Sequence, residues 1–99
     1  MLLIAGTVRV PVGKVDALRG AAQTMIAETR KEDGCFSYAF AQDLIDPGLI
    51  HISETWRDGA ALKAHGESTH MAAWRTVGAG LEIGERNLKL YRTEEGKPI

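Results

Sequence analysis

The chain has 99 residues, of which 44% are hydrophobic and 25% charged, and its formal net charge is −1. This length accommodates one folded domain, residues 1–99, and excludes a separate cofactor-binding module. The near-zero net charge argues against a basic surface for nucleic acid and against a polybasic membrane patch.

The distribution of apolar residues and cysteine indicates the compartment. The longest apolar run, near residues 1–5, is far shorter than the roughly 20 residues that a membrane-spanning helix needs. Cys35 is the one cysteine, so no internal disulfide can form and nothing requires an oxidising compartment. We therefore expect a cytoplasmic protein that binds neither membranes nor nucleic acid.

The first predicted elements are a strand and a helix. Residues 2–10 are rich in β-branched and aliphatic side chains and are closed by Pro11, which predicts a strand. Residues 13–30 predict a helix, because their apolar positions recur with helical spacing. Gly34 follows that helix and can supply the left-handed exit.

A second and a third strand follow as an antiparallel pair. Residues 35–43 alternate large and small side chains, which predicts a strand with Phe36, Tyr38 and Phe40 on one side. Cys35 is expected on the other side, as an inert packing residue. The turn chemistry of Asp46-Pro47-Gly48 separates this strand from the next, residues 49–57.

Two more helices and a last strand complete the chain. Asp58 is a good N-cap for a short helix at residues 60–65, and Ser68 or Thr69 can cap a longer helix at 71–83. Residues 87–93 predict the fourth strand. Residues 94–99 are expected to form a loose tail, which leaves an ordered core of residues 1–93.

The order β-α-β-β-α-β predicts an α+β, ferredoxin-like fold, in which both helices cover one face of an antiparallel sheet. The first strand is apolar on both sides, with Leu2 and Val8 on one and Leu3 and Ala5 on the other. An exposed apolar sheet face is a liability, so we expect a second copy to cover it, sheet against sheet, in an obligate two-fold homodimer. The alternative is a monomer with a mildly apolar open face.

Three titratable residues are candidates for catalysis. Glu54, His65 and His70 lie on segments short enough to surround one cavity, and an imidazole titrates near neutral pH. Glu54 shares its strand face with apolar residues, so it should be partly buried and need a partner, either Arg9 or a histidine. A structural ion-pair role for Glu54, a capping role for His65 and a surface position for His70 are the alternatives.

Aromatic and apolar residues near these groups are candidates for substrate binding. Tyr38 could donate to a substrate oxygen, and Trp74, one helical turn after His70, could stack on an aromatic substrate. The other expected cavity residues are Phe40, Trp56 and Met71. The alternative for both tryptophans is an ordinary core position.

No metal site is expected. His65 and His70 are five residues apart, not the four of a helical zinc pair, and no second cysteine is present. His51 alternates onto the other face of its strand, away from this group.

A set of short motifs carries a family resemblance. They are Glu32-Asp33-Gly34-Cys35 with Tyr38, Asp46-Pro47, residues 52–58 (ISETWRD), Ala61-Leu62, Ala64-His65, and Ser68-Thr69-His70-Met71 followed by Trp74. With these motifs the chain resembles the antibiotic biosynthesis monooxygenase family of dimeric α+β barrels, and within it the quinol monooxygenase type. The resemblance implies small homodimers joined through their sheet faces, each monomer with a pocket between sheet and helices.

The resemblance also implies an activity. Some family members oxygenate phenols or quinols with O2 and use neither metal nor flavin, so we expect a cofactor-independent monooxygenase of a small aromatic substrate. His70 or His65 would take the substrate proton, while Glu54 and Tyr38 would orient the substrate. Glu54 could also act as the base itself. The alternatives are an enol-forming isomerase of a small carbonyl compound and a non-catalytic domain that binds a small molecule.

Overall fold

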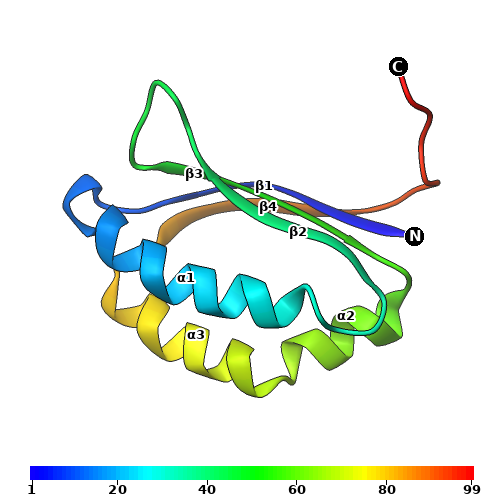
Figure 1. The fold of residues 1–99 in the computed structure, drawn as a ribbon. Helices are drawn as coiled ribbons and strands as arrows, with labels where there is room; N and C mark the ends of the chain where they lie inside the picture. The colour runs from blue at the N-terminus through cyan, green and yellow to red at the C-terminus, as the bar shows by residue number, and fades with distance from the viewer.

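The computed structural model describes residues 1–99, which form a four-stranded antiparallel sheet with helices on one face (Figure 1). The elements in chain order are β1 Leu2–Arg9, the 3-10 turn η1 Val12–Lys14, α1 Val15–Thr29, β2 Cys35–Gln42, β3 Leu49–Trp56, α2 Gly59–Gly66, α3 Thr69–Gly80 and β4 Gly84–Arg92. The predicted α+β, ferredoxin-like fold is confirmed.

The sheet has the strand order β2-β3-β1-β4, and its register places the site. Glu54 on β3 pairs with Tyr38 on β2 and with Ile4 on β1. Directly paired residues of neighbouring strands point to the same face of a sheet. Tyr38 and Glu54 are therefore side by side on the face that the helices cover.

An irregularity at the start of β2 corrects the predicted alternation. The register shifts between Cys35 and Ser37, so Phe36 is the extra residue of a bulge. Phe36 is 60% exposed and borders a hollow with Met1 and Thr55 on the open face. Cys35 instead packs against the core beside Tyr38, where burial raises the pKa of its thiol. The prediction that Phe36 shares a face with Tyr38 was wrong, because one inserted residue reverses the alternation.

Two helices begin after predicted caps, Asp58 before α2 and Ser68 before α3, although α3 begins at Thr69 and not at residue 71. The Asp58 side chain accepts a 2.9 Å hydrogen bond from the Ala61 N–H, and Ser68 accepts one of 3.3 Å from Met71. α3 ends at Gly80, three residues before the predicted end, because Glu82 adopts a left-handed φ of 55° in the turn to β4.

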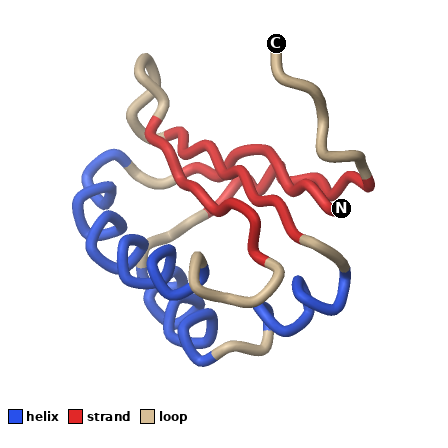
Figure 2. The backbone as a smooth tube through the Cα atoms, turned by 45° about the vertical axis from the view of Figure 1, so that its right-hand side comes forward, coloured by secondary structure: helices blue, strands red, loops and turns tan.

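The core lies between the sheet and the helices, and the opposite sheet face is uncovered (Figures 1 and 2). Its largest fully buried side chain is Trp56, which packs with Leu2, Met25, Tyr38 and Ala61. The C-terminal residues beyond Arg92 form no helix or strand and run away from the sheet (Figure 1). None of the helices has the length and apolar character that crossing a membrane requires.

Candidate functional site

A cavity of about 280 Å³ lies between α3 and the covered face of the sheet. Four residues that the sequence predicted for substrate binding or catalysis line it: Tyr38, Phe40, Glu54 and Trp74. The wall thus combines a carboxylate, a phenol and two further aromatic rings. These groups come from β2, β3 and α3, which the sheet register and the helix packing bring together.

Glu54 is the buried acid of this cavity, with 7% of its surface exposed. Its Oε1 accepts a 3.0 Å hydrogen bond from the indole Nε1 of Trp56. Its Oε2 has no partner in the chain, and because no buried side-chain oxygen lacks a hydrogen bond, Oε2 must be accessible from the cavity. Burial raises the pKa of Glu54, while the Trp56 hydrogen bond and the charge of His65 oppose the rise.

The expected partner of Glu54 was not found. Arg9 pairs instead with Asp46, at 2.9 Å, and with Glu85, at 3.4 Å. Neither histidine forms a hydrogen bond with Glu54. Trp56 is the partner of Glu54 instead. Residues i and i+2 of a strand share a face, so the indole N–H of Trp56 lies next to the Glu54 carboxylate.

Tyr38 lines the same cavity. Its ring is buried, and the hydroxyl forms no hydrogen bond with the chain. Burial, and then the negative charges of Glu54 and Glu32, raise the pKa of Tyr38 above its usual value. The phenol therefore stays protonated at neutral pH and is a free hydrogen-bond donor at the cavity wall.

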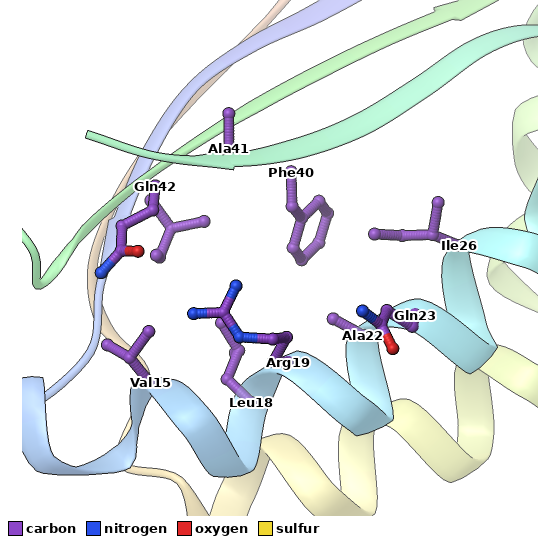
Figure 3. A pocket seen from close by; sticks show the side chains of 10 residues that line it. Val15, Leu18, Arg19, Ala22, Gln23, Ile26, Phe40, Ala41 and Gln42 are labelled. Atoms are coloured by element: carbon purple, nitrogen blue, oxygen red, sulfur yellow. The ribbon is translucent and has the colours of Figure 1, made fainter. Parts of the chain in front are cut away.

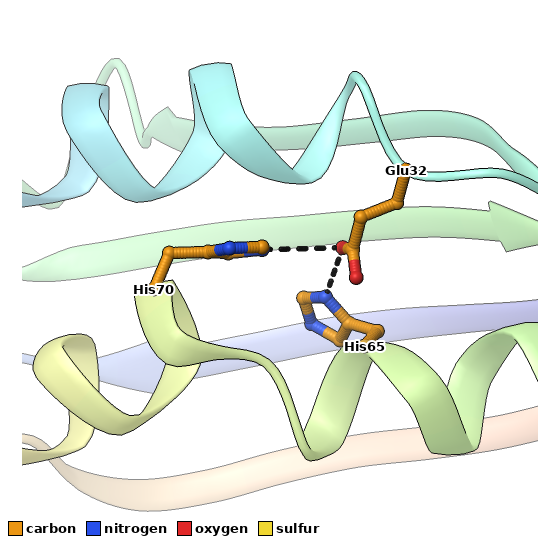
Figure 4. Close-up of side chains that lie close together, drawn as sticks. All are labelled: Glu32, His65 and His70. Carbon is orange, nitrogen blue, oxygen red and sulfur yellow. Dashed lines mark hydrogen bonds and ion pairs between the residues drawn. The ribbon is translucent and has the colours of Figure 1, made fainter.

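The two candidate histidines meet at a carboxylate that the sequence analysis did not select (Figure 4). Oε2 of Glu32 lies 2.6 Å from Nδ1 of His65 and 3.3 Å from Nε2 of His70. The three residues come from the loop after α1, the last turn of α2 and the first turn of α3. One sequence feature could have identified Glu32 as a site residue. It begins the motif Glu32-Asp33-Gly34-Cys35, immediately after a helix end.

Neither histidine lines the cavity. The ring of His65 is buried, with ring centroids 4.7 Å from Trp56 and 5.3 Å from Tyr38, so it lies behind the tyrosine. His70 borders a shallow hollow between α1 and α3, together with Trp74. The histidine cluster therefore contacts the cavity only through aromatic side chains.

Trp56 and Met71 were expected to shape the cavity but do not line it. Trp56 is fully buried and Met71 packs against the same part of the core. Both therefore support the cavity wall from behind. For Trp56 this position agrees with the alternative of an ordinary core residue.

Two arginines that the sequence analysis did not select also line the cavity. Arg75 of α3 donates a 2.6 Å hydrogen bond to the Gly66 carbonyl. Arg86 of β4 opposes the rise in pKa of both Tyr38 and Glu54 by its positive charge. Arg86 was missed because the predicted fourth strand began at residue 87.

A second cavity, of about 180 Å³, lies between α1 and β2 (Figure 3). Its walls are mostly apolar, and Arg19 is the one charged side chain there. It contains no group that could accept a proton, so we place the candidate site in the larger cavity. Phe40 lines both cavities and forms part of the wall between them.

Comparison with known proteins extends these observations. The family described as antibiotic biosynthesis monooxygenase matches residues 1–77 of the chain. A Bacillus subtilis protein named "Putative monooxygenase YcnE" is 27% identical over 94 residues, which are 95% of this chain and 97% of that protein. The Mycobacterium tuberculosis protein Rv0793, whose name has the same wording, is 36% identical over 69 residues, which are 70% of this chain and 62% of that protein.

Solved structures agree with the fold. The crystal structure of a "putative antibiotic biosynthesis monooxygenase" from Deinococcus radiodurans superposes with a TM-score of 0.89 at 25% identity. The match covers 100% of this chain and 98% of that one. The structure of Rv0793 superposes with a TM-score of 0.79 at 28% identity, over 98% of this chain and 97% of that one.

Proposed function

The chain belongs to the antibiotic biosynthesis monooxygenase family, and from this premise we propose that it is a cofactor-independent monooxygenase of a small phenol or quinol. The observation that carries the proposal is the composition of the 280 Å³ cavity. An accessible carboxylate oxygen of Glu54, the free hydroxyl of Tyr38 and the ring of Trp74 face one space that can hold a small aromatic molecule.

The proposed reaction needs a base and a dry cavity. Triplet oxygen reacts slowly with closed-shell molecules, but a phenolate is electron-rich and can give an electron to O2. Recombination puts one oxygen atom on the ring, and the other leaves as water, so that phenol and O2 give quinone and water. The substrate supplies all the electrons, and no external reductant is needed.

The proposed roles follow from position. Glu54 takes the substrate proton, because among the three candidate bases it alone lines the cavity, and its raised pKa suits a general base. Tyr38 donates to the substrate oxygen, and Trp74 and Phe40 contact the ring. His65 and His70, which were first candidates for the base, do not line the cavity and form no hydrogen bond with Glu54, so we give them no part in this step.

We also propose that the protein acts as a homodimer through the open sheet face. Small side chains occupy the middle of that face, where Ser53 of β3 lies between Ala5 of β1 and Ala39 of β2. Such a surface allows close approach of a second sheet. A two-fold contact would leave the cavity on the helix side of each subunit free.

Oxygen uptake with a panel of quinols and phenols tests the proposal. We expect consumption of O2 with incorporation of one labelled atom from ¹⁸O2, and a fall in kcat of about 10²–10⁴-fold in Glu54→Gln. The matched control is Glu28→Gln, an exposed glutamate of α1, which should keep wild-type activity.

Other results would support the alternatives. Substrate turnover that continues unchanged under argon would indicate an isomerase. Saturable binding of quinols without any turnover would indicate a binding domain. A wild-type rate in Glu54→Gln would contradict the assignment of the base.

A further inference from the structure

We propose that Glu32, His65 and His70 form a binding site for one divalent transition-metal ion of the zinc type. The proposal goes beyond the oxygenase function, because it concerns a cluster outside the 280 Å³ cavity. It also goes against the expectation from the sequence that no metal site is present. That expectation considered only the spacing of the two histidines and not a third ligand from another segment.

The geometry of the three ligand atoms supports the proposal. Glu32, His65 and His70 each offer one ligand atom, and these three atoms lie within 4.8 Å of one another. Zinc bonds of about 2.0–2.1 Å in a tetrahedral site put neighbouring ligand atoms roughly 3.4 Å apart. The distance of 3.3 Å between Glu32 and His70 already fits, and the 2.6 Å between Glu32 and His65 must widen by less than about 1 Å. The two histidine nitrogens, at most 4.8 Å apart, must approach by no more than about 1.4 Å.

The donor set selects the class of ion. Two imidazoles and one carboxylate suit Zn²⁺ and its first-row neighbours, whereas Ca²⁺ and Mg²⁺ prefer oxygen ligands alone. Three protein ligands leave a fourth position for water, as in many zinc sites with an open coordination position. The side chains of Glu32 and His70 are 16% and 19% exposed, so an ion and a water molecule can reach them.

The surroundings hold the ligands in place before an ion arrives. The His65 side chain, 5% exposed, is packed against Trp56 and Tyr38, which fix its ring. Ser68 joins the two helices, since its Oγ donates to the His65 carbonyl at 2.6 Å. Its 3.2 Å contact with Nε2 of His70 uses the nitrogen that would bind the ion, so this one contact is given up on binding. Binding therefore needs only small movements of side chains that are already ordered.

Metal binding must compete with protons. Nδ1 of His65 and Nε2 of His70 coordinate an ion only through free lone pairs, so affinity should fall as the pH is lowered. An ion on these nitrogens would also prevent them from accepting a proton.

Calorimetric titration of the tag-free full chain with ZnCl2, after treatment with a chelator, tests the proposal. We expect one ion per chain at pH 7.5 and weaker binding at pH 5.5. Both Glu32→Gln and His70→Ala should weaken binding by at least about tenfold, because the first removes the negative charge of a ligand and the second removes an imidazole. The matched control is His51→Ala, which removes the third histidine of the chain and its 2.8 Å contact with Asp43, and it should bind as wild type does.

Three results would overturn the proposal: no saturable 1:1 binding, unchanged affinity in both ligand variants, or loss of binding in His51→Ala. X-ray absorption at the zinc edge of the loaded wild-type protein needs no variant, and so does not depend on whether a variant folds. We expect two imidazoles in the first shell, and a shell without them would also overturn the proposal. Such failures would leave the oxygenase proposal standing, because oxygen uptake is measured separately on chelator-treated protein.

Discussion

Trp56 donates its indole N–H to Glu54, two residues earlier on the same face of β3, at 3.0 Å. The indole is fully buried and needs an acceptor, and the carboxylate is nearly buried and needs a donor. One contact satisfies both groups and leaves the second carboxylate oxygen free. The strand therefore carries an acid whose orientation is fixed by its own neighbour.

This arrangement predicts how Glu54→Gln changes stability with pH. The folded-state pKa of Glu54 is raised above its ordinary value of 4.5, so the folded state holds its proton more tightly than the unfolded state. Stability contributed by this group is therefore present below pH 4.5 and is lost as the pH rises through the raised pKa. Glutamine keeps an acceptor for Trp56 and carries no charge.

We therefore expect Glu54→Gln to gain stability relative to wild type between pH 4 and pH 8. Each unit by which the pKa is raised corresponds to about 1.4 kcal/mol. Urea unfolding of both proteins at several pH values measures the difference. A glutamine variant that loses stability relative to wild type toward pH 8 would contradict the prediction.

The histidine cluster predicts a second effect on stability. Glu32→Ala removes the partner of Nδ1 in the buried His65 side chain, which should cost about 1–3 kcal/mol in the free energy of unfolding. Glu28→Ala is the matched control, because Glu28 pairs only with Lys31 on the surface, and its loss should cost less than about 1 kcal/mol. Urea unfolding measures both variants. If Glu32→Ala and Glu28→Ala lose the same free energy of unfolding, the contact of Glu32 with His65 does not stabilise the fold.

The observed positions of Glu54 and Asp58 show which structural features can be predicted from neighbouring residues in the sequence. Glu54 was placed on the covered face of its strand because it shares that face with Ile50, Ile52 and Trp56, and all four are buried. Asp58 was predicted as a cap because capping depends on residues within one turn. Both features depend on residues close in the sequence.

Features that depend on distant residues were missed. The bulge at Phe36 depends on how β2 pairs with β3, and nothing in its own segment indicates it. Glu32 meets His65 and His70 only because the end of α1 packs beside the junction of α2 and α3. Arg86 reaches the cavity from an edge strand that begins earlier than its apolar residues suggest.

Phe40 predicts the size of substrate that the cavity accepts. Its ring stacks on Tyr38 at 5.7 Å and meets Trp74 edge-on at 5.8 Å, and it lines both the 180 Å³ and the 280 Å³ cavities. Phe40→Ala should join these spaces, so kcat/KM should rise for two- and three-ring quinols relative to one-ring quinols. The lost packing should cost roughly 2 kcal/mol or more in unfolding free energy.

The matched control for this change is Phe36→Ala. Phe36 lies on the other face of the sheet and is largely exposed, so its removal should leave the ratio of kcat/KM values as in wild type. An unchanged ratio in Phe40→Ala would mean that the substrate does not occupy this cavity.

The position of Ser53 predicts how a charge on the open sheet face would affect dimerisation. It is exposed in the middle of the open face, so Ser53→Lys should leave an isolated subunit folded, with the ammonium in water. In a two-fold dimer the same change brings two ammonium groups into an interface of small side chains, where the loss of hydration costs several kcal/mol. Because each 1.4 kcal/mol is about tenfold in Kd, such a cost should convert a micromolar dimer into a monomer.

Light scattering during size-exclusion chromatography at several concentrations measures this shift. Thr76→Lys, on the exposed side of α3, adds the same charge away from the sheet and should remain dimeric. A wild-type protein that is monomeric at every concentration would remove the dimer altogether. If instead Thr76→Lys dissociates and Ser53→Lys does not, the subunits must meet through their helices, and the mouth of the cavity beside α3 would then lie near the partner.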